Sequence, residues 1–249
     1  MLRWIYSNLV LLSLLLSAQL IAAQTTMSSA AKMQVPVLAI KGAIGPAVSD
    51  YISQEIMLAN EKSQVAAIVL TIDTPGGLSS SLRVINQQIL SSNIPILCLV
   101  YPQGARAASA GTYILYACHI AAMASATTLG AATPVMIGGG LPGGQKAPEK
   151  PSEPTAMEKK VLNDSVAYIR SLAQLRARNA EWAELAVTEA ATMSAQEALA
   201  DNVINLIGQT PEQLVLALDG TAITLNEQQL VLKLTHVELE YRTPDWRNQ

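Results

Sequence analysis

The chain contains no phenylalanine, and aromatic residues make up only 4% of its 249 residues. Stacking platforms for nucleic-acid bases need several exposed aromatic side chains, so this composition argues against them. Basic residues are also few: 16 Lys and Arg stand against 19 Asp and Glu, which gives a formal net charge of −3. A basic surface of the kind that binds phosphate backbones is therefore absent as well. We expect no nucleic-acid partner.

Cysteine and histidine are equally scarce, with two of each. No cysteine stands near a histidine at a metal-ligand spacing, so we expect no metal and no other cofactor. In an exported protein Cys98 and Cys118 could form a disulfide. The sequence favours the alternative that both are buried free thiols, which behave as small hydrophobic residues. His119 is expected to be structural, and His236 to be a solvated residue of the tail.

The N-terminal residues form a targeting segment. Arg3 precedes a short apolar run at 9–16, and small residues around Ala23 offer a cleavage point. Residues 1–23 are thus predicted to be a signal peptide, or a retained N-terminal anchor because Ile21 is large for its place in a cleavage site. Either way the chain is expected to be exported and extracytoplasmic. No later apolar run is long enough to span a membrane.

The rest of the chain alternates strands and helices. Nearly continuous apolar runs at 65–72 and 94–100 are typical of buried parallel strands, and they are separated by a helical pattern at 78–90. This predicts an α/β fold of βαβ units with right-handed crossovers. We expect a linker at 24–34, one main domain at 35–220 with a flexible Gly- and Pro-rich loop at 137–156, and a C-terminal hairpin and tail at 221–249.

Ser109 is the candidate nucleophile. It lies among small residues that follow the strand 94–100, in the first turn of a helix expected at 107–117. Helix N-termini present free N–H groups and a positive dipole end, which stabilise a developing negative charge. The adjacent strand ends at Gly76-Gly77, and the carboxyl ends of parallel strands meet at one crevice. The N–H groups of Gly77 and Ala110 are therefore candidates for an oxyanion hole beside Ser109.

A serine nucleophile needs a general base. His119 is expected at the far end of the Ser109 helix, and His236 lies in the tail, so neither histidine is a credible base. A lysine can serve when it is desolvated, because it then loses its charge near neutral pH. Four lysines are candidates, and their spacing does not decide among them: Lys146, Lys150, Lys159 and Lys160.

Three segments together resemble a known family. They are 73–77 (Asp-Thr-Pro-Gly-Gly), 104–114 around Ser109, and 167–173 with the following Arg178 and Asn179. They resemble the NfeD-type membrane-associated serine proteases, which belong to the ClpP/crotonase superfamily and cluster with stomatin-like proteins. The resemblance implies a ClpP/crotonase-like fold of repeated ββα/βαβ units, with Ser109 as nucleophile, Lys160 as base, and Gly77 and Ala110 as oxyanion donors.

The implied function is that of an exported serine endopeptidase with a Ser-Lys dyad. Its expected substrates are apolar peptide segments, notably those of a stomatin-like membrane partner, and a homodimer or larger oligomer is expected. Three alternatives remain: a signal-peptide-peptidase-like protease, a catalytically inactive ClpP-like scaffold that binds a stomatin-like protein, and a crotonase-like hydratase. The last needs carboxylates in the crevice and a cytosolic chain, which the export signal opposes.

The chain departs from the family pattern in two ways. The loop before Lys160 is longer than usual, so the reach from Lys160 to Ser109 depends on how that loop folds. Family members also continue into membrane helices and a small OB-like barrel, whereas this sequence stops at Gln249. We therefore expect a short form or a truncated product.

Overall fold

The computed structural model describes residues 32–135 and 155–244, and the fold is described for these ranges only. The predicted signal peptide at 1–23 and most of the linker at 24–34 lie outside them. The same holds for the predicted loop at 137–156, except for its last two residues.

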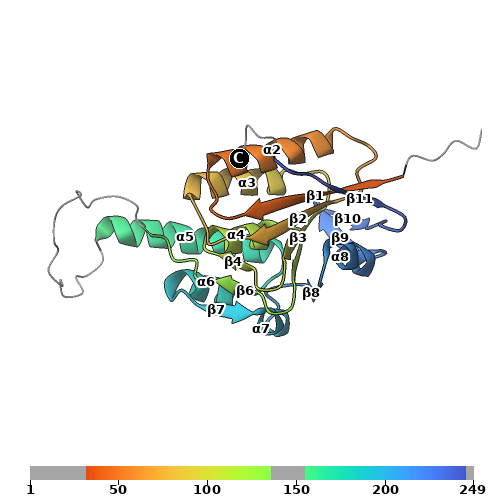
Figure 1. Ribbon diagram of the computed structural model, residues 1–249. Helices are drawn as coiled ribbons and strands as arrows, with labels where there is room; N and C mark the ends of the chain where they lie inside the picture. Colours follow the sequence, from red (N-terminus) through yellow and green to blue (C-terminus); the bar gives the residue numbers. More distant parts are fainter. Residues whose placement is uncertain (1–31, 136–154, 245–249) are drawn as a thin grey trace, which may run out of the picture. The chain divides into compact units, whose positions relative to one another are not determined.

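A six-stranded sheet forms the centre of the fold (Figure 1). In spatial order its strands are β11 (Glu238–Tyr241), β1 (Gln34–Lys41), β2 (Ile68–Asp73), β3 (Ile96–Val100), β5 (Ile120–Met123) and β8 (Leu206–Ile207). All neighbouring strands are parallel. Parallel strands need crossover connections, and helices supply most of them here. The predicted α/β class is thus confirmed.

Alternate residues of each strand pack into different cores. On β2 and β3, Leu70 and Cys98 face a large core, whereas Val69 and Leu97 face a smaller one. The helices that cover the large core are α2 (Pro46–Asn60), α3 (Ser79–Leu90), α4 (Ala110–Ala117), α5 (Ala156–Leu175) and α6 (Ala180–Thr188). The smaller core lies under α8 (Pro211–Leu218) and a C-terminal hairpin. Because both faces are covered, the central strands β3 and β5 are entirely apolar and β2 nearly so.

A second, three-stranded sheet carries the chain into α4. Its strands are β4 (Arg106–Ala108), β6 (Thr128–Gly130) and β7 (Thr192–Ser194), and α7 (Ala195–Ala200) follows β7. The sequence did not predict this sheet, because three residues are too few to show a strand period. It also shortens the predicted helix 107–117, which begins only at Ala110.

The C-terminal segment forms a separate two-stranded sheet and contributes one strand, β11, to the main sheet. The predicted hairpin is present as β9 (Ala222–Leu225) and β10 (Gln228–Val231). After it, β11 returns and pairs in parallel with β1, where Val35 lies opposite Leu239. β1 and β11 are about 200 residues apart in the sequence, so the alternation of polar and apolar residues within each strand could not predict that they pair.

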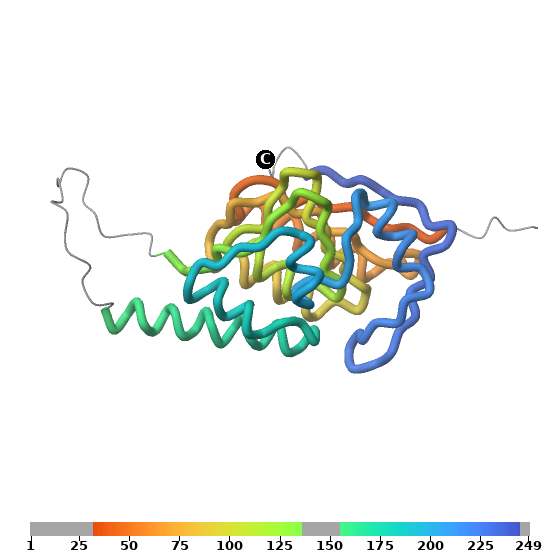
Figure 2. The backbone as a smooth tube through the Cα atoms, turned by 90° about the horizontal axis from the view of Figure 1, so that it is seen from below, coloured from red at the N-terminus to blue at the C-terminus, as the bar shows by residue number. Residues whose placement is uncertain are grey.

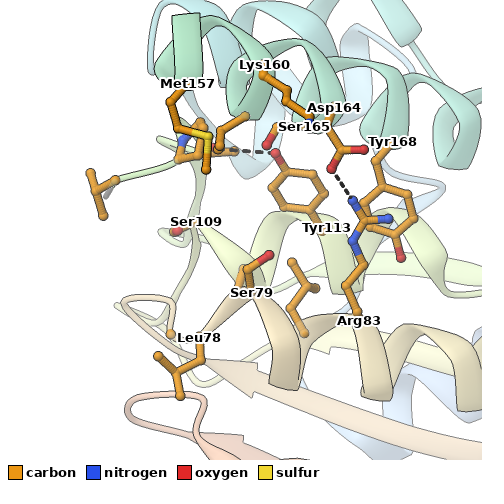
Figure 3. A pocket seen from close by; sticks show the side chains of 17 residues that line it. Leu78, Ser79, Arg83, Ser109, Tyr113, Met157, Lys160, Asp164, Ser165 and Tyr168 are labelled. Carbon is orange, nitrogen blue, oxygen red and sulfur yellow. Dashed lines mark hydrogen bonds and ion pairs between the residues drawn. The ribbon is translucent and has the colours of Figure 1, made fainter. Parts of the chain in front are cut away.

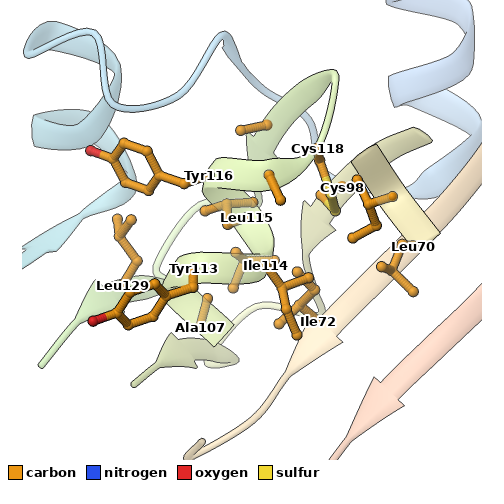
Figure 4. Packing of buried hydrophobic residues seen from close by; sticks show 14 of the residues in the cluster. Leu70, Ile72, Cys98, Ala107, Tyr113, Ile114, Leu115, Tyr116, Cys118 and Leu129 are labelled. Atoms are coloured by element: carbon orange, nitrogen blue, oxygen red, sulfur yellow. A yellow bond between two sulfur atoms is a disulfide. The ribbon is translucent and has the colours of Figure 1, made fainter. Parts of the chain in front are cut away.

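Cys98 and Cys118 form a disulfide, with their Cα atoms 6.0 Å apart (Figure 4). The expectation of two free thiols was therefore wrong. Cys98 lies on β3 and Cys118 is the C-cap of α4, and both are fully buried. The end of α4 lies directly against β3. The two cysteines are 20 residues apart in the sequence, so this contact could not be predicted from their spacing.

Across the described ranges, no helix is both long enough and apolar enough to cross a membrane.

Candidate active site

Ser109 lies in a strained turn between β4 and α4. Its φ of 52° and ψ of −117° place it outside the regions that non-glycine residues ordinarily occupy. It is the N-cap of α4, yet its hydroxyl accepts no capping hydrogen bond. Such strain is held only when the surroundings determine the conformation, and it often marks functional sites. The half-buried hydroxyl is thus presented at the positive end of a helix.

Two threonines hold the turns around Ser109. Thr112 Oγ1 lies 2.8 Å from the carbonyl oxygen of Ala107, and it accepts a hydrogen bond from Gly130 N–H. Gly130 in turn accepts a hydrogen bond from Ser109 N–H, at 3.0 Å. Thr74 acts similarly on the other turn, where its hydroxyl accepts from Gly76 N–H at 3.0 Å. Both turns are therefore fixed by buried hydrogen bonds.

The glycine pair is required by close packing. A Cβ atom on Gly76 would lie 2.6 Å from Ser109 Cβ, and one on Gly77 would lie 2.0 Å from the carbonyl oxygen of Ile44. Gly76 also has a φ of 114°, which favours glycine. The pair thus brings the backbone after β2 directly against Ser109. Among the described residues, no acceptor pairs with the N–H of Gly77 or Ala110, which leaves both groups available to a ligand.

One pocket of about 560 Å³ contains all four predicted site residues (Figure 3). Ser109 lies on one side of it and Lys160, on α5, lies on the other, and Gly77 and Ala110 also contribute to the lining. Of the candidate lysines, Lys146 and Lys150 lie outside the described residues, and Lys159 does not line this pocket. The Lys160 side chain is exposed. Thr155 caps α5 through a reciprocal pair of hydrogen bonds with Glu158, which fixes where this helix begins.

Most of the remaining lining is apolar. Leu78, Val135 and Met157 are large hydrophobic residues that remain exposed at this pocket, with exposed fractions of 42%, 79% and 58%. Exposed apolar side chains gathered at one concavity are typical of a binding site. The pocket therefore suits an apolar ligand.

A cluster of three further residues, Arg83, Asp164 and Tyr168, lines this pocket and was missed by sequence reasoning. Arg83 Nη2 lies 2.7 Å from Asp164 Oδ2, and the Arg83 guanidinium lies 3.6 Å above the ring of Tyr168. Tyr168 stacks on Tyr113, whose pKa is raised to about 12, mainly by burial. Asp164 stands one helical turn after Lys160, and this spacing was the only signal in the sequence.

The opposite end of α4 is capped by two arginines. Arg178 is buried and donates hydrogen bonds to the carbonyls of Leu115, Tyr116 and Cys118 at 2.9–3.0 Å. Arg176 donates to the Ala117 carbonyl at 2.8 Å. Burial lowers the pKa of Arg178 to about 9, and the nearby Arg176 adds to this shift. These cations complement the negative end of the helix that begins at Ser109.

His119 follows the C-cap of α4, at the opposite end of the helix from Ser109. It is buried, and its Nδ1 accepts a hydrogen bond from Ile96 N–H at 3.1 Å. Burial lowers its pKa to about 3, with further lowering from Arg176 and Arg178. The predicted structural role of His119 is confirmed. In the ranges 32–135 and 155–244, no three His, Cys, Asp or Glu side chains gather into a possible metal site.

The parallel sheet, the paired glycines and the serine at the N-terminus of α4 together define an α/β domain of ClpP-like fold. Residues 34–241 match the family described as NfeD1b, N-terminal domain. The chain belongs to this family, and the resemblance inferred from its three segments is confirmed.

A curated relative is the membrane-bound protease PH1510 of Pyrococcus horikoshii, which is 36% identical over 221 residues. The match covers 88% of this chain and 48% of that protein, so the chain spans about half the length of the curated relative.

Solved structures of the 1510-N membrane-bound stomatin-specific protease are also similar. A lysine-to-alanine mutant in complex with a substrate peptide is 35% identical with a TM-score of 0.75, and the match covers 88% of this chain and 95% of that one. A serine-to-alanine mutant is 36% identical with a TM-score of 0.74, covering 86% and 100%.

Proposed function

We propose that this chain is a serine endopeptidase that uses Ser109 as nucleophile and Lys160 as general base. The observation that carries the proposal is a pocket in which a strained serine at a helix N-terminus lies across from a lysine. Two backbone N–H groups that have no acceptor among the described residues line the same pocket. The relatives support it, since they are described as proteases and were studied as serine and lysine mutants.

The reaction begins with neutral Lys160, which takes the proton of the Ser109 hydroxyl while the oxygen attacks the scissile carbonyl carbon. The oxyanion of the tetrahedral intermediate accepts hydrogen bonds from the N–H groups of Gly77 and Ala110. Lys160 then gives its proton to the leaving amine, which leaves an acyl-serine. Lys160 next takes a proton from water as the water oxygen attacks the acyl carbon. When the bond from this carbon to Ser109 Oγ breaks, Lys160 returns the proton to Oγ, which releases the acid product and restores Ser109.

Lys160 must lose its charge for this chemistry, although its side chain is exposed in the free chain. We propose that the substrate itself excludes water. An apolar segment laid between α5 and the Ser109 turn would cover Lys160 with hydrocarbon, and low polarity disfavours the ammonium form. The exposed Leu78, Val135 and Met157 supply the matching apolar surface.

The proposed substrate is an apolar segment of a stomatin-like membrane protein. The similar solved proteases are described as stomatin-specific, which supports this choice. We further propose that the chain works as a homodimer or larger oligomer on the extracytoplasmic side of the membrane, exported by residues 1–23. N-terminal sequencing of the protein purified from cells tests the export step, because cleavage would start the mature chain at Gln24.

The test is cleavage of a peptide from the hydrophobic C-terminal part of a stomatin-like protein. Cleavage should be lost in Ser109→Ala and reduced by several orders of magnitude in Lys160→Ala, while Lys159→Ala, which changes a lysine outside the pocket, should cleave normally. If Ser109→Ala cleaves like the wild type, the proposal is wrong. Peptide binding without cleavage by the wild type would instead support the inactive scaffold.

A further inference from the structure

The Arg83–Asp164 ion pair lies at the same pocket as Lys160 but has no part in the proposed reaction. It links α3 to α5 across a sequence separation of 81 residues, with a distance of 2.7 Å between Arg83 Nη2 and Asp164 Oδ2 (Figure 3). Such exposed pairs contribute little to stability on average. Its main effect is therefore expected on the charge of neighbouring side chains, and not on the stability of the fold.

Asp164 stands four residues after Lys160 on the same helix. Side chains at this spacing are neighbours on a helix surface, and a carboxylate there stabilises the charged form of a lysine. In the structure Asp164 pairs with Arg83 instead, and Lys160 forms no ion pair with any described residue. The carboxylate that could keep Lys160 protonated is thus already engaged.

The Arg83 side chain is held in place from several sides. Its guanidinium stacks on the Tyr168 ring at 3.6 Å, and the Tyr168 hydroxyl accepts a hydrogen bond from Asn86 Nδ2 at 3.0 Å. Asn86 is fully buried on α3, one turn after Arg83. Because a planar guanidinium can stack and pair at the same time, it holds the carboxylate in one place more firmly than a flexible ammonium would.

We propose that Arg83 is a positioning residue for the Ser109–Lys160 reaction: it binds the Asp164 carboxylate and adds its own positive charge nearby, so that Lys160 can lose its proton. This inference rests on the proposed function of Lys160.

No other titratable group described around Lys160 supplies a free charge that could take over the role of this ion pair. From α4, Tyr113 faces the pocket with a pKa raised to about 12 by burial, so its hydroxyl is neutral in the working range. On α5 itself, Glu158 is engaged by Thr155 in the helix cap, and Lys159 is not among the residues that line the pocket. From α6, Glu184 pairs with Arg170, more than two turns farther along α5.

The test is the pH at which Lys160 is half labelled by trace acetic anhydride, measured by residue-resolved mass spectrometry on the full chain. Relative to the wild type, Arg83→Gln should raise this pH by about 0.5 unit, and Asp164→Asn should lower it by a similar amount. The double variant removes both charges, so its pH of half labelling should be close to that of the wild type. Arg83→Lys keeps the charge and should also remain close.

The cleavage rate should follow the same order, with the acid limb of the pH–rate profile moving up in Arg83→Gln and down in Asp164→Asn. A purely structural bridge would make both single variants change in the same direction, and that result would overturn the inference. Unchanged labelling in both single variants would overturn it as well. The proposed function fails separately, if cleavage survives in Ser109→Ala, whatever the labelling shows.

Discussion

Ser109 keeps its unusual backbone angles because the residues next to it leave no alternative. Gly76 lies so close that any side chain there would meet Ser109 Cβ, while Thr112 and Gly130 hold the backbone from the other side. The position from which the hydroxyl enters the pocket is therefore set by the backbone. A small displacement of a reacting group can cost a large factor in rate, so this packing is open to a direct test.

Gly76→Ala should lower kcat/KM for peptide cleavage by roughly a hundredfold, because the new methyl group would push Ser109 out of position. Gly104→Ala is the matched control. Gly104 also has a positive φ, of 84°, but a Cβ atom there would meet no other atom within 4 Å. Both variants carry backbone strain, so equal losses of activity would show that the contact with Ser109 is unimportant.

His119 predicts how stability depends on pH. Its pKa falls from 6.5 to about 3 in the folded chain, mainly through burial. Below pH 6.5 the unfolded chain therefore binds a proton that the folded chain does not, and the free energy of unfolding decreases as the pH falls toward 3. The slope that this residue contributes is at most about 1.4 kcal/mol per pH unit.

Denaturant unfolding at pH 7, 6 and 5 measures this contribution as the difference between wild type and His119→Asn. The wild type should lose more stability than the variant over this range, whereas His236→Asn, which changes the exposed tail histidine, should follow the wild type. Parallel curves for all three proteins would show that His119 is not the responsible group.

At the scale of elements, α4 links the candidate site to the core. Its N-terminus carries Ser109, while its C-terminus is held by Arg178, Arg176 and the disulfide between Cys98 and Cys118. A buried arginine that donates to several carbonyls replaces the hydrogen bonds that a helix end otherwise lacks. The short helix is thus fixed at the end opposite the serine.

Arg178→Met should lower the free energy of unfolding by about 2–4 kcal/mol, because it leaves several buried carbonyls without a donor. Arg176→Met removes one such hydrogen bond and should cost about 1 kcal/mol. Denaturant titration at neutral pH measures both values. A loss no larger for Arg178→Met than for Arg176→Met would contradict the capping role assigned here.

Elements with a strong local signal could be predicted from the sequence. The apolar runs of β2 and β3 and the helix α3 between them lie within a few residues of their expected positions. The strands β4, β6 and β7 carry no such signal, since each has three residues and forms only by pairing with the others. Because these strands were not predicted, the strained turn at Ser109 was not predicted either.

The candidate site was partly predictable for the same reason. Ser109 and Gly77 follow local motifs, and the ends of adjacent parallel strands bring them together. The choice between Lys159 and Lys160 depends instead on the rotation of α5 about its axis, which packing against α4 and α6 decides. The Arg83–Asp164 pair joins two helices far apart in the chain, so only the assembled fold reveals it.

Across the whole described domain, the sheet brings together groups from three separate parts of the chain. The turn after β2 contributes Gly77, the start of α4 contributes Ser109, and α5 contributes Lys160. The first turns of α5 extend beyond the sheet and its other helices, and the buried residues of α5 come from its later half (Figure 2). The proposed base, Lys160, is therefore carried by the less buried part of its helix, where a bound peptide would change its surroundings.

The most direct measurement is the reaction of the full chain with a fluorophosphonate probe, with the adduct located by mass spectrometry. We predict that the phosphonyl group is found on Ser109, that Ser109→Ala is not labelled, and that Lys160→Ala reacts much more slowly than Lys159→Ala. Labelling of Ser109→Ala at the wild-type rate, or no adduct on Ser109 in the wild type, would contradict a nucleophilic serine in this pocket.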